Sequence, residues 1–258
     1  KRGQPSAEYF IDSKGKKIKS IHYEYSISNS HNGIGEKPIY GLITTKYRIK
    51  YGGDWDWSVY GRYNYTHGRV LPSLTTVKFY SENQDVVSES IVLNQYEKTT
   101  LNNKEYIFLQ ETKTSDLNQQ FDYKVFKYPH QYTTSTDDFG QGITNLKNKG
   151  VLNAVIETYE YKAMTNASAR LYFNGGINKY KTDLPVVDQV YTFQPRSSVY
   201  SFTPSSIIGN MFKFDENYKP VIKFNEYTLL GNPRSMQKEG DTKQVFLWDY
   251  NDTYPVAK

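Results

Sequence analysis

Alternation of large apolar and polar residues at every second position recurs along almost the whole chain. Successive side chains of an extended strand point to opposite faces of a sheet, so this period predicts strands that each pack on one face. Short polar segments such as DSKGKK, SENQD and LNNK separate the runs and have the lengths of hairpin loops. The sequence therefore predicts an all-β fold built as a long antiparallel meander. The clearest runs are residues 21–25, 47–51, 57–65, 121–125 and 155–161.

The composition indicates how such a meander is covered. Tyrosine (25 residues) and phenylalanine (13 residues) supply many of the large side chains. Both suit a half-buried pleated surface, because an aromatic ring can lie along a sheet while a tyrosine hydroxyl stays in water. The mean hydropathy of −0.73 argues against a thick core with two buried faces. We therefore expect a curved, open sheet with much surface per residue.

One segment, residues 139–152 with the sequence FGQGITNLKNKGVL, departs from the strand pattern. Ile143 and Leu146 follow helical spacing, and Gly150 is suited to end a helix. An Asp or Thr of the preceding TTSTDD stretch can cap its beginning. We predict one short helix near residues 140–150.

Strands of the same style lie on both sides of this helix. The helix is therefore interpreted as an insertion in one continuous β domain that spans residues 1–258. The only boundary that it suggests within that domain separates residues 1–132 from residues 151–258. Because the chain begins KRGQPSAEYF and stops directly after a strand-like run, we expect it to be a fragment of a longer chain.

Charges of both signs are interspersed. The 32 basic and 27 acidic residues leave a net charge of +5, and the densest basic cluster is Lys14, Lys16, Lys17 and Lys19. This mixed pattern is typical of a solvated surface and argues against a nucleic-acid partner. No apolar run approaches the ~18 residues of a membrane-spanning helix. The chain has no cysteine, which excludes disulfides and thiolate metal sites and is compatible with an extracellular bacterial protein.

Residues that carry catalysis or bind metals do not cluster in the sequence. The four histidines lie in four separate neighbourhoods, and no G-x-S-x-G elbow, phosphate-binding loop or dinucleotide fingerprint is present. A pair of carboxylates placed for glycoside hydrolysis is not excluded by a sequence, although nothing points to one. We predict no enzymatic activity, no cofactor and no metal site.

The most suggestive local feature is the run Asp54, Trp55, Asp56 and Trp57, which follows a Gly-Gly turn. On a strand, both indoles face one side of the sheet and both carboxylates face the other. Exposed indoles beside carboxylates can form a platform for sugar rings, and we hold these four residues as a candidate glycan site. The alternative, which we favour, is that the tryptophans anchor a sheet edge and the aspartates are solvated. Trp248 is also interpreted as structural, because it lies inside a repeat motif that is described below.

Several turns share one frame. An apolar or aromatic residue is followed by a short polar residue, two variable positions, a turn-former and a polar residue. The polar side chain can accept hydrogen bonds from the main chain two residues on, and glycine can adopt the positive φ that the turn requires. The frame occurs at Ile11–Lys16, at Phe214-Asp215 to Lys219 and at Tyr227–Asn232, and more loosely at Tyr80–Asp85.

The last of these turns and the end of the chain resemble the YD-repeat (Rhs-type) units of large surface and secreted proteins of Bacteroidetes. In that family a Y-D-x-x-G-N-P turn leads into a strand that ends in W-x-Y-N-x-x-Y-P. The resemblance covers roughly residues 75–258, and the chain departs from it at Thr228, where the family has Asp, and at Tyr218, where it has Gly. The residues that carry it are Phe214, Asp215, Tyr227, Gly231, Asn232, Pro233, Trp248, Tyr250 and Asn251.

The resemblance implies strips of antiparallel sheet that coil into a curved wall or part of a shell. It also implies a location outside a bacterial cell or at its surface, and a piece of a larger protein. We therefore expect a non-enzymatic scaffold for adhesion, display or encapsulation, whose partners are other YD-repeat segments or a surface protein. The alternative is a glycan-binding or carbohydrate-active module that uses residues 54–57.

Overall fold

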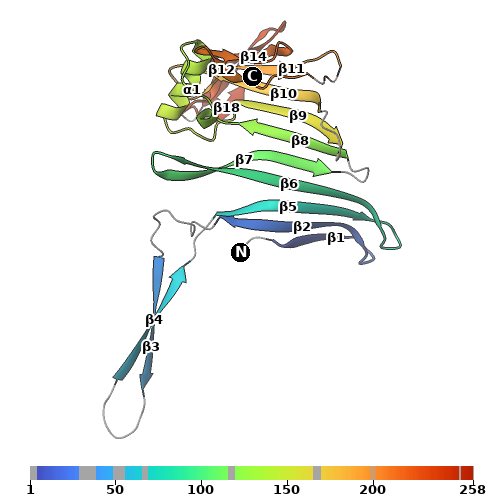
Figure 1. The fold of residues 1–258 in the computed structure, drawn as a ribbon, viewed down its shortest axis with the longest axis vertical. Helices are drawn as coiled ribbons and strands as arrows, with labels where there is room; N and C mark the ends of the chain where they lie inside the picture. Colours follow the sequence, from blue (N-terminus) through green and yellow to red (C-terminus); the bar gives the residue numbers. More distant parts are fainter. Residues whose placement is uncertain are drawn as a thin grey trace.

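The computed structural model describes residues 5–28, 39–48, 56–65, 69–115, 120–164, 170–197, 199, 201–249 and 251–257. Side chains are described for residues 5–25 and, outside the gaps already given, from residue 71 onward except at residues 120, 164 and 257. One antiparallel sheet dominates the fold, and it does not close into a barrel (Figure 1). The prediction of an all-β, open meander is therefore confirmed.

Twelve strands make up this main sheet, and most lie beside the strand that follows them in the chain. In spatial order they are β1 (Ala7–Ile11), β2 (Lys17–Ser28), β5 (Arg69–Tyr80), β6 (Val86–Leu101), β7 (Lys104–Ser115), β8 (Gln120–Lys127), β9 (Glu157–Met164), β10 (Leu171–Tyr180), β11 (Val187–Phe193), β14 (Tyr218–Tyr227), β15 (Pro233–Lys238) and β16 (Lys243–Val245).

Three hairpins leave the main sheet and pair only within themselves. They are β3 (Ile39–Arg48) with β4 (Asp56–Tyr65), β12 (Ser206–Ile208) with β13 (Met211–Lys213), and β17 (Leu247–Asp249) with β18 (Tyr254–Ala257). A short 3-10 helix, η1 (Pro129–Gln131), and the helix α1 (Asp138–Asn148) connect β8 to β9. The two strands nevertheless pair directly, so the sheet continues across the helical insertion.

The helix α1 forms where the sequence predicts it. Asp137 caps its first turn by accepting a hydrogen bond from the Gly140 main-chain N–H at 3.1 Å. Gly150, with φ of +73°, follows the last turn in the left-handed conformation typical of a helix end. A Cβ atom on Gly142 would lie 2.3 Å from the carbonyl oxygen of Tyr180, so this glycine lets α1 approach β10 closely.

The core lies between α1, the hairpin β12–β13 and one face of the sheet from β8 to β14. Ile143 and Leu146 of α1 are fully buried there, and Phe139 stacks on Phe212 of β13 with ring centroids 4.5 Å apart. We call β8–β11 and β14, together with η1, α1, β12 and β13, the covered part. Its buried cluster consists of Tyr132, Ile143, Leu146, Ile156, Tyr161, Tyr172, Ile177, Tyr180, Phe193, Phe212 and Tyr218.

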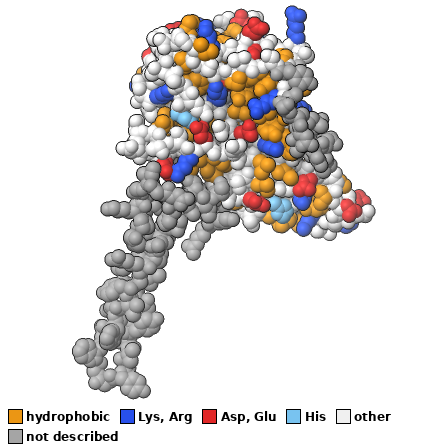
Figure 2. Space-filling view, in the orientation of Figure 1, with side chains coloured by type: hydrophobic (Ala, Val, Ile, Leu, Met, Phe, Trp, Pro, Cys, Tyr) orange, Lys and Arg blue, Asp and Glu red, His pale blue; other side chains and the backbone are white. Residues whose placement is uncertain are grey.

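The strands β1, β2, β5 and β6 form what we call the open part, because no second layer of described strands or helices covers them (Figure 1). The cover reaches this part at Glu97 of β6, which contacts His130 and Gln131 of η1. Large apolar side chains there remain exposed, and Figure 2 shows hydrophobic side chains reaching the surface among charged ones. The exposed ones are Tyr9, Phe10, Ile11, Ile18, Phe79, Val86, Val87 and Leu93. Four of the twelve strands of the main sheet thus form a largely single-layered region.

Candidate functional site

The candidate glycan platform of the sequence falls largely outside what the structure describes. Asp54 and Trp55 lie outside the described residues. The main chain of Asp56 and Trp57 belongs to β4 and pairs with Arg48 and Tyr47 of β3, but their side chains are not among those described. The glycan-binding role of this run therefore stays a prediction.

The turn frame has a definite geometry at Asp12. Its Oδ1 atom accepts hydrogen bonds from the main-chain N–H groups of Lys14 and Lys16, at 2.8 and 2.9 Å. Gly15 adopts a φ of +78°, which an L side chain rarely adopts. The Gly15 N–H donates to the Asp12 carbonyl oxygen at 3.1 Å and closes the turn.

The turn at Thr228 repeats this arrangement with a hydroxyl in place of the carboxylate. Thr228 Oγ1 accepts from the N–H groups of Leu230 and Asn232, at 3.2 and 3.1 Å, and Gly231 has a φ of +84°. Ser81 also accepts from an N–H four residues on, that of Asp85. A threonine at this position thus supplies the same hydrogen-bond acceptor as an aspartate.

The turn at Asp215 shares only half of the frame. Its Oδ1 atom accepts from the Asn217 N–H at 2.9 Å, as the frame predicts. Tyr218, at the position of the glycine, does not have a positive φ; instead it begins β14 and is buried. Asp215 Oδ2 accepts from the Thr203 N–H at 3.1 Å, so this carboxylate also holds a distant loop.

The other motif residues tie the end of the chain to the turn between β14 and β15. Asn232 Nδ2 donates to the main-chain oxygen of Asp252 at 2.7 Å, and the indole Nε1 of Trp248 donates to that of Pro233 at 2.9 Å. Tyr227 donates its hydroxyl to the main-chain oxygen of Val187. Of the remaining motif residues, Asn251 takes a positive φ in the β17–β18 turn, and Tyr250 lies outside the described residues.

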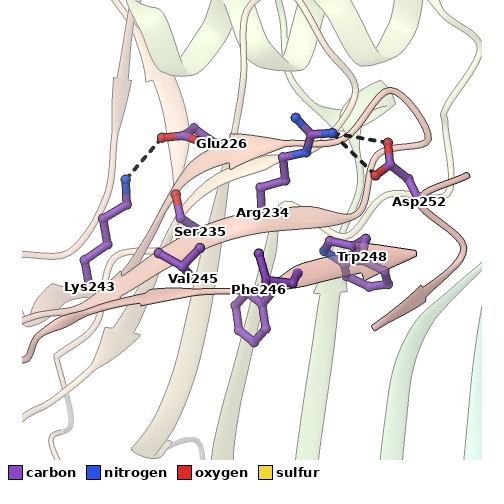
Figure 3. Close-up of a pocket in the computed structure, with 9 residues that line it drawn as sticks. Glu226, Arg234, Ser235, Lys243, Val245, Phe246, Trp248 and Asp252 are labelled. Atoms are coloured by element: carbon purple, nitrogen blue, oxygen red, sulfur yellow. Dashed lines mark hydrogen bonds and ion pairs between the residues drawn. The ribbon is translucent and has the colours of Figure 1, made fainter. Parts of the chain in front are cut away.

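A half-open cavity of about 260 Å³ lies beside β15, and Trp248 and Asp252 line it (Figure 3). In Figure 3 the charged groups lie along its upper side, with Val245, Phe246 and Trp248 below them. The sequence reasoning singled out Trp248 but treated it only as a strand anchor. The lining residues are Glu226, Arg234, Ser235, Lys243, Val245, Phe246, Leu247, Trp248 and Asp252.

Two ion pairs border this cavity. Lys243 Nζ lies 3.1 Å from Glu226 Oε1, and an Arg234 guanidinium nitrogen lies 3.4 Å from both carboxylate oxygens of Asp252. All four side chains are partly exposed, so each pair contributes only about 0–1 kcal/mol. Ser235 lies between them and is buried, and its hydroxyl has no hydrogen-bond partner among the described residues.

A second polar cluster lies inside the covered part, around Glu157. This buried carboxylate accepts from the Ser205 N–H at 2.8 Å, the Ser205 hydroxyl at 2.5 Å and the Tyr218 hydroxyl at 3.0 Å. Lys127 Nζ lies 3.8 Å from it and donates to the Ser205 carbonyl oxygen. Burial raises the pKa of Glu157 and lowers that of Lys127, in each case against partly compensating neighbours.

The Glu157 cluster joins the cover to the sheet. The carboxylate does not line the cavity beside β15 or the second cavity, which lies around Lys179. It joins β9 to the loop before β12 and thereby fixes the cover on the sheet. The sequence analysis did not single out Glu157, although the sequence places it on one face of a strand with Tyr159 and Tyr161. These two tyrosines belong to the apolar face of β9.

The described part of the chain carries neither a metal-binding cluster nor a membrane-spanning helix. No group of three or more His, Asp or Glu residues there is placed to hold a metal ion. No helix in that part is long and apolar enough to cross a membrane. In the second cavity, Lys179 Nζ lies 3.8 Å from Asp138 and 3.6 Å from Asp188, so these two of its three acidic residues already have a cation.

Comparisons with known proteins find no relative of this chain. No family model, no curated protein and no solved structure matches this chain. The resemblance to YD-repeat proteins therefore stays a prediction that depends on the motif residues quoted above.

Proposed function

We propose that this chain is a non-enzymatic wall segment of a large bacterial surface or secreted protein of the YD-repeat type. The observation that carries the proposal is the long open sheet, of which β1 and β16 are the outermost strands. An outermost strand presents main-chain N–H and C=O groups that another strand can pair with. Such a sheet can be continued by a neighbouring segment, which is how a scaffold for adhesion, display or encapsulation is assembled.

The open part supports the same role. Phe10 and Ile11 on β1 are 42% and 61% exposed, and Phe79 on β5 is 44% exposed, so apolar surface continues to the very edge of the sheet. A sheet with apolar groups exposed along an outermost strand is suited to association with another strand or surface. The partner that we propose is another YD-repeat segment or a surface protein, outside the cell.

Association through β1 is tested by replacing Phe10 and Ile11 together with lysine. We expect the unmodified chain to self-associate at increasing concentration, measured by light scattering after size exclusion, and to bind an apolar dye. The double variant should lose both properties because charge on an outermost strand prevents strand addition. The matched control replaces Leu229 and Leu230 with lysine. These two residues are equally apolar and more exposed, but they lie in a turn.

A monomer at every concentration that does not bind the dye would contradict the wall proposal. So would a control variant that loses association as fully as the β1 variant does. The second candidate function, glycan binding, is favoured by a different observation, the cavity beside Trp248.

A further inference from the structure

The cavity at the end of the sheet has walls that the chain holds in place by itself. The hydrogen bond from Trp248 to Pro233 fixes the indole, and the bond from Asn232 to Asp252 fixes the opposite turn. The Phe246 N–H donates to the Arg234 carbonyl oxygen at 2.8 Å and joins β15 to the segment that leads into β17. All three bonds involve main-chain atoms, so the cavity does not depend on a ligand to form.

The charges around the cavity select against a charged ligand. Two cations, Arg234 and Lys243, face two carboxylates, Asp252 and Glu226, so the lining has no net charge. An anion would meet two carboxylates, and a cation would meet two basic groups. A neutral ligand with many hydroxyl groups can instead accept hydrogen bonds from the basic groups and donate hydrogen bonds to the carboxylates at the same time.

Apart from Ser235, the remaining lining is apolar. Trp248 is partly exposed, and Val245 and Leu247 are exposed. Indole and aliphatic groups suit the C–H face of a sugar ring, which also carries the hydroxyl groups that the ion pairs can bind. The volume of about 260 Å³ lies just below the ~300–1,000 Å³ of sites for drug-sized ligands, which favours a single ring.

We propose that this cavity binds one neutral hexopyranose unit of a glycan. Trp248 supplies the stacking surface, and Arg234 with Asp252 supplies hydrogen bonds to neighbouring hydroxyls. The unpartnered hydroxyl of Ser235, which lies between the two ion pairs, is a further polar group of the lining. This site differs from residues 54–57 and does not depend on the wall proposal.

The test begins with a glycan array, followed by titration of the neutral sugars that bind. The readout is the indole N–H signals of the three tryptophans in a ¹⁵N-labelled sample, each assigned with a Trp→Phe variant. We expect the sugar to shift the Trp248 signal. If no neutral sugar binds, the proposal fails, and if only the signals of Trp55 and Trp57 shift, the glycan site is the one at residues 54–57.

Two substitutions test the polar contacts, Asp252→Asn and Arg234→Gln. Asn tolerates the φ of +62° at position 252, and the main-chain bond to Asn232 is retained, so the cavity keeps its shape. Each variant should bind the sugar about tenfold more weakly, the loss expected for one hydrogen bond to a charged group. Glu239→Gln, in the nearby exposed turn outside the lining, is the matched control and should bind normally.

Unchanged affinity in both cavity variants would overturn the proposal, as would tighter binding of free amino acids, whose two charges also match the ion pairs. The β1 double variant at Phe10 and Ile11 should bind sugar as the unmodified chain does. The wall proposal and the sugar proposal can therefore fail separately.

Discussion

The open and covered parts are built from the same alternating strands but are stabilised differently. In the covered part, buried side chains from α1 and β13 pack on the sheet, as Leu146 and Phe212 do. In the open part, neighbouring strands stabilise one another across the surface: Lys19 Nζ lies 5.2 Å from the ring centre of Phe10 and 5.6 Å from that of Phe79. Cross-strand pairs contribute roughly 0.2–1 kcal/mol each, whereas full burial of one large apolar side chain contributes ~1.5–3 kcal/mol.

This difference teaches that strand periodicity does not determine whether a sheet has a second layer. What distinguishes the covered part is that two insertions, residues 129–148 and 206–213, fold back over it. The largest effects of substitution should therefore be confined to residues that join these insertions to the sheet.

Truncation of a buried leucine should have the largest effect. Leu146→Ala removes a fully buried side chain from α1 and should lower the free energy of unfolding by about 2–5 kcal/mol. The matched change in the open part, Leu93→Ala on β6, removes a side chain that is 39% exposed and should cost less than about 1 kcal/mol. Urea unfolding followed by circular dichroism measures both. Equal losses would show that the two parts do not differ as described.

Removal of the Glu157 carboxylate should have the next largest effect. Glu157→Ala leaves the buried groups of Ser205 and Tyr218 without their acceptor and should cost about 3 kcal/mol. Glu157→Gln keeps an acceptor oxygen and should cost less.

Removal of the Glu157 carboxyl group should also change how the stability of the fold depends on pH. Burial raises the pKa of Glu157 above its ordinary value of 4.5, so the folded state retains this proton where the unfolded state has lost it. Its contribution to stability is complete below pH 4.5 and is lost as the pH rises through the folded-state pKa. Glu157→Gln should remove the part of the pH dependence that Glu157 causes. The measurement compares the free energy of unfolding of the unmodified chain with that of the variant from pH 4 upward. Parallel curves would mean that Glu157 is ionised in the fold as readily as in the unfolded chain.

Much of the fold can be predicted from the sequence because it depends on local chemistry. The meander follows from the alternation, α1 follows from Ile143, Leu146 and Gly150, and the turns at Asp12 and Thr228 follow from an acceptor placed before a glycine. These features need only neighbouring residues.

The cover and the cavity need contacts that neighbouring residues do not specify. The hairpin β12–β13 has the same strand chemistry as the others, and nothing local indicates that it leaves the sheet to pack on Phe139. Arg234 and Asp252 are eighteen residues apart and meet only because β17 and β18 fold back along β15. The position of Glu157 on the apolar face of its strand does predict a buried polar cluster, because an acidic residue on such a face needs buried partners.

The smallest expected effect is the loss of the side-chain acceptor of a turn, compared between the buried turn that follows β14 and a turn of the open part. Thr228 is buried, so Thr228→Ala leaves the N–H groups of Leu230 and Asn232 without an acceptor in a partly buried turn and should cost about 1–2 kcal/mol. Asp12→Ala removes the same kind of acceptor in the open part, where water can replace it, and should cost less than about 0.5 kcal/mol.

Thr228→Asp is the control for this turn, because a carboxylate there can accept the same two hydrogen bonds that Asp12 accepts. It should therefore be less destabilising than Thr228→Ala when both are unfolded in urea. If Thr228→Asp is the more destabilising of the two, burial of the added charge outweighs the turn geometry, and the equivalence of the two turns holds only where the acceptor is in contact with water.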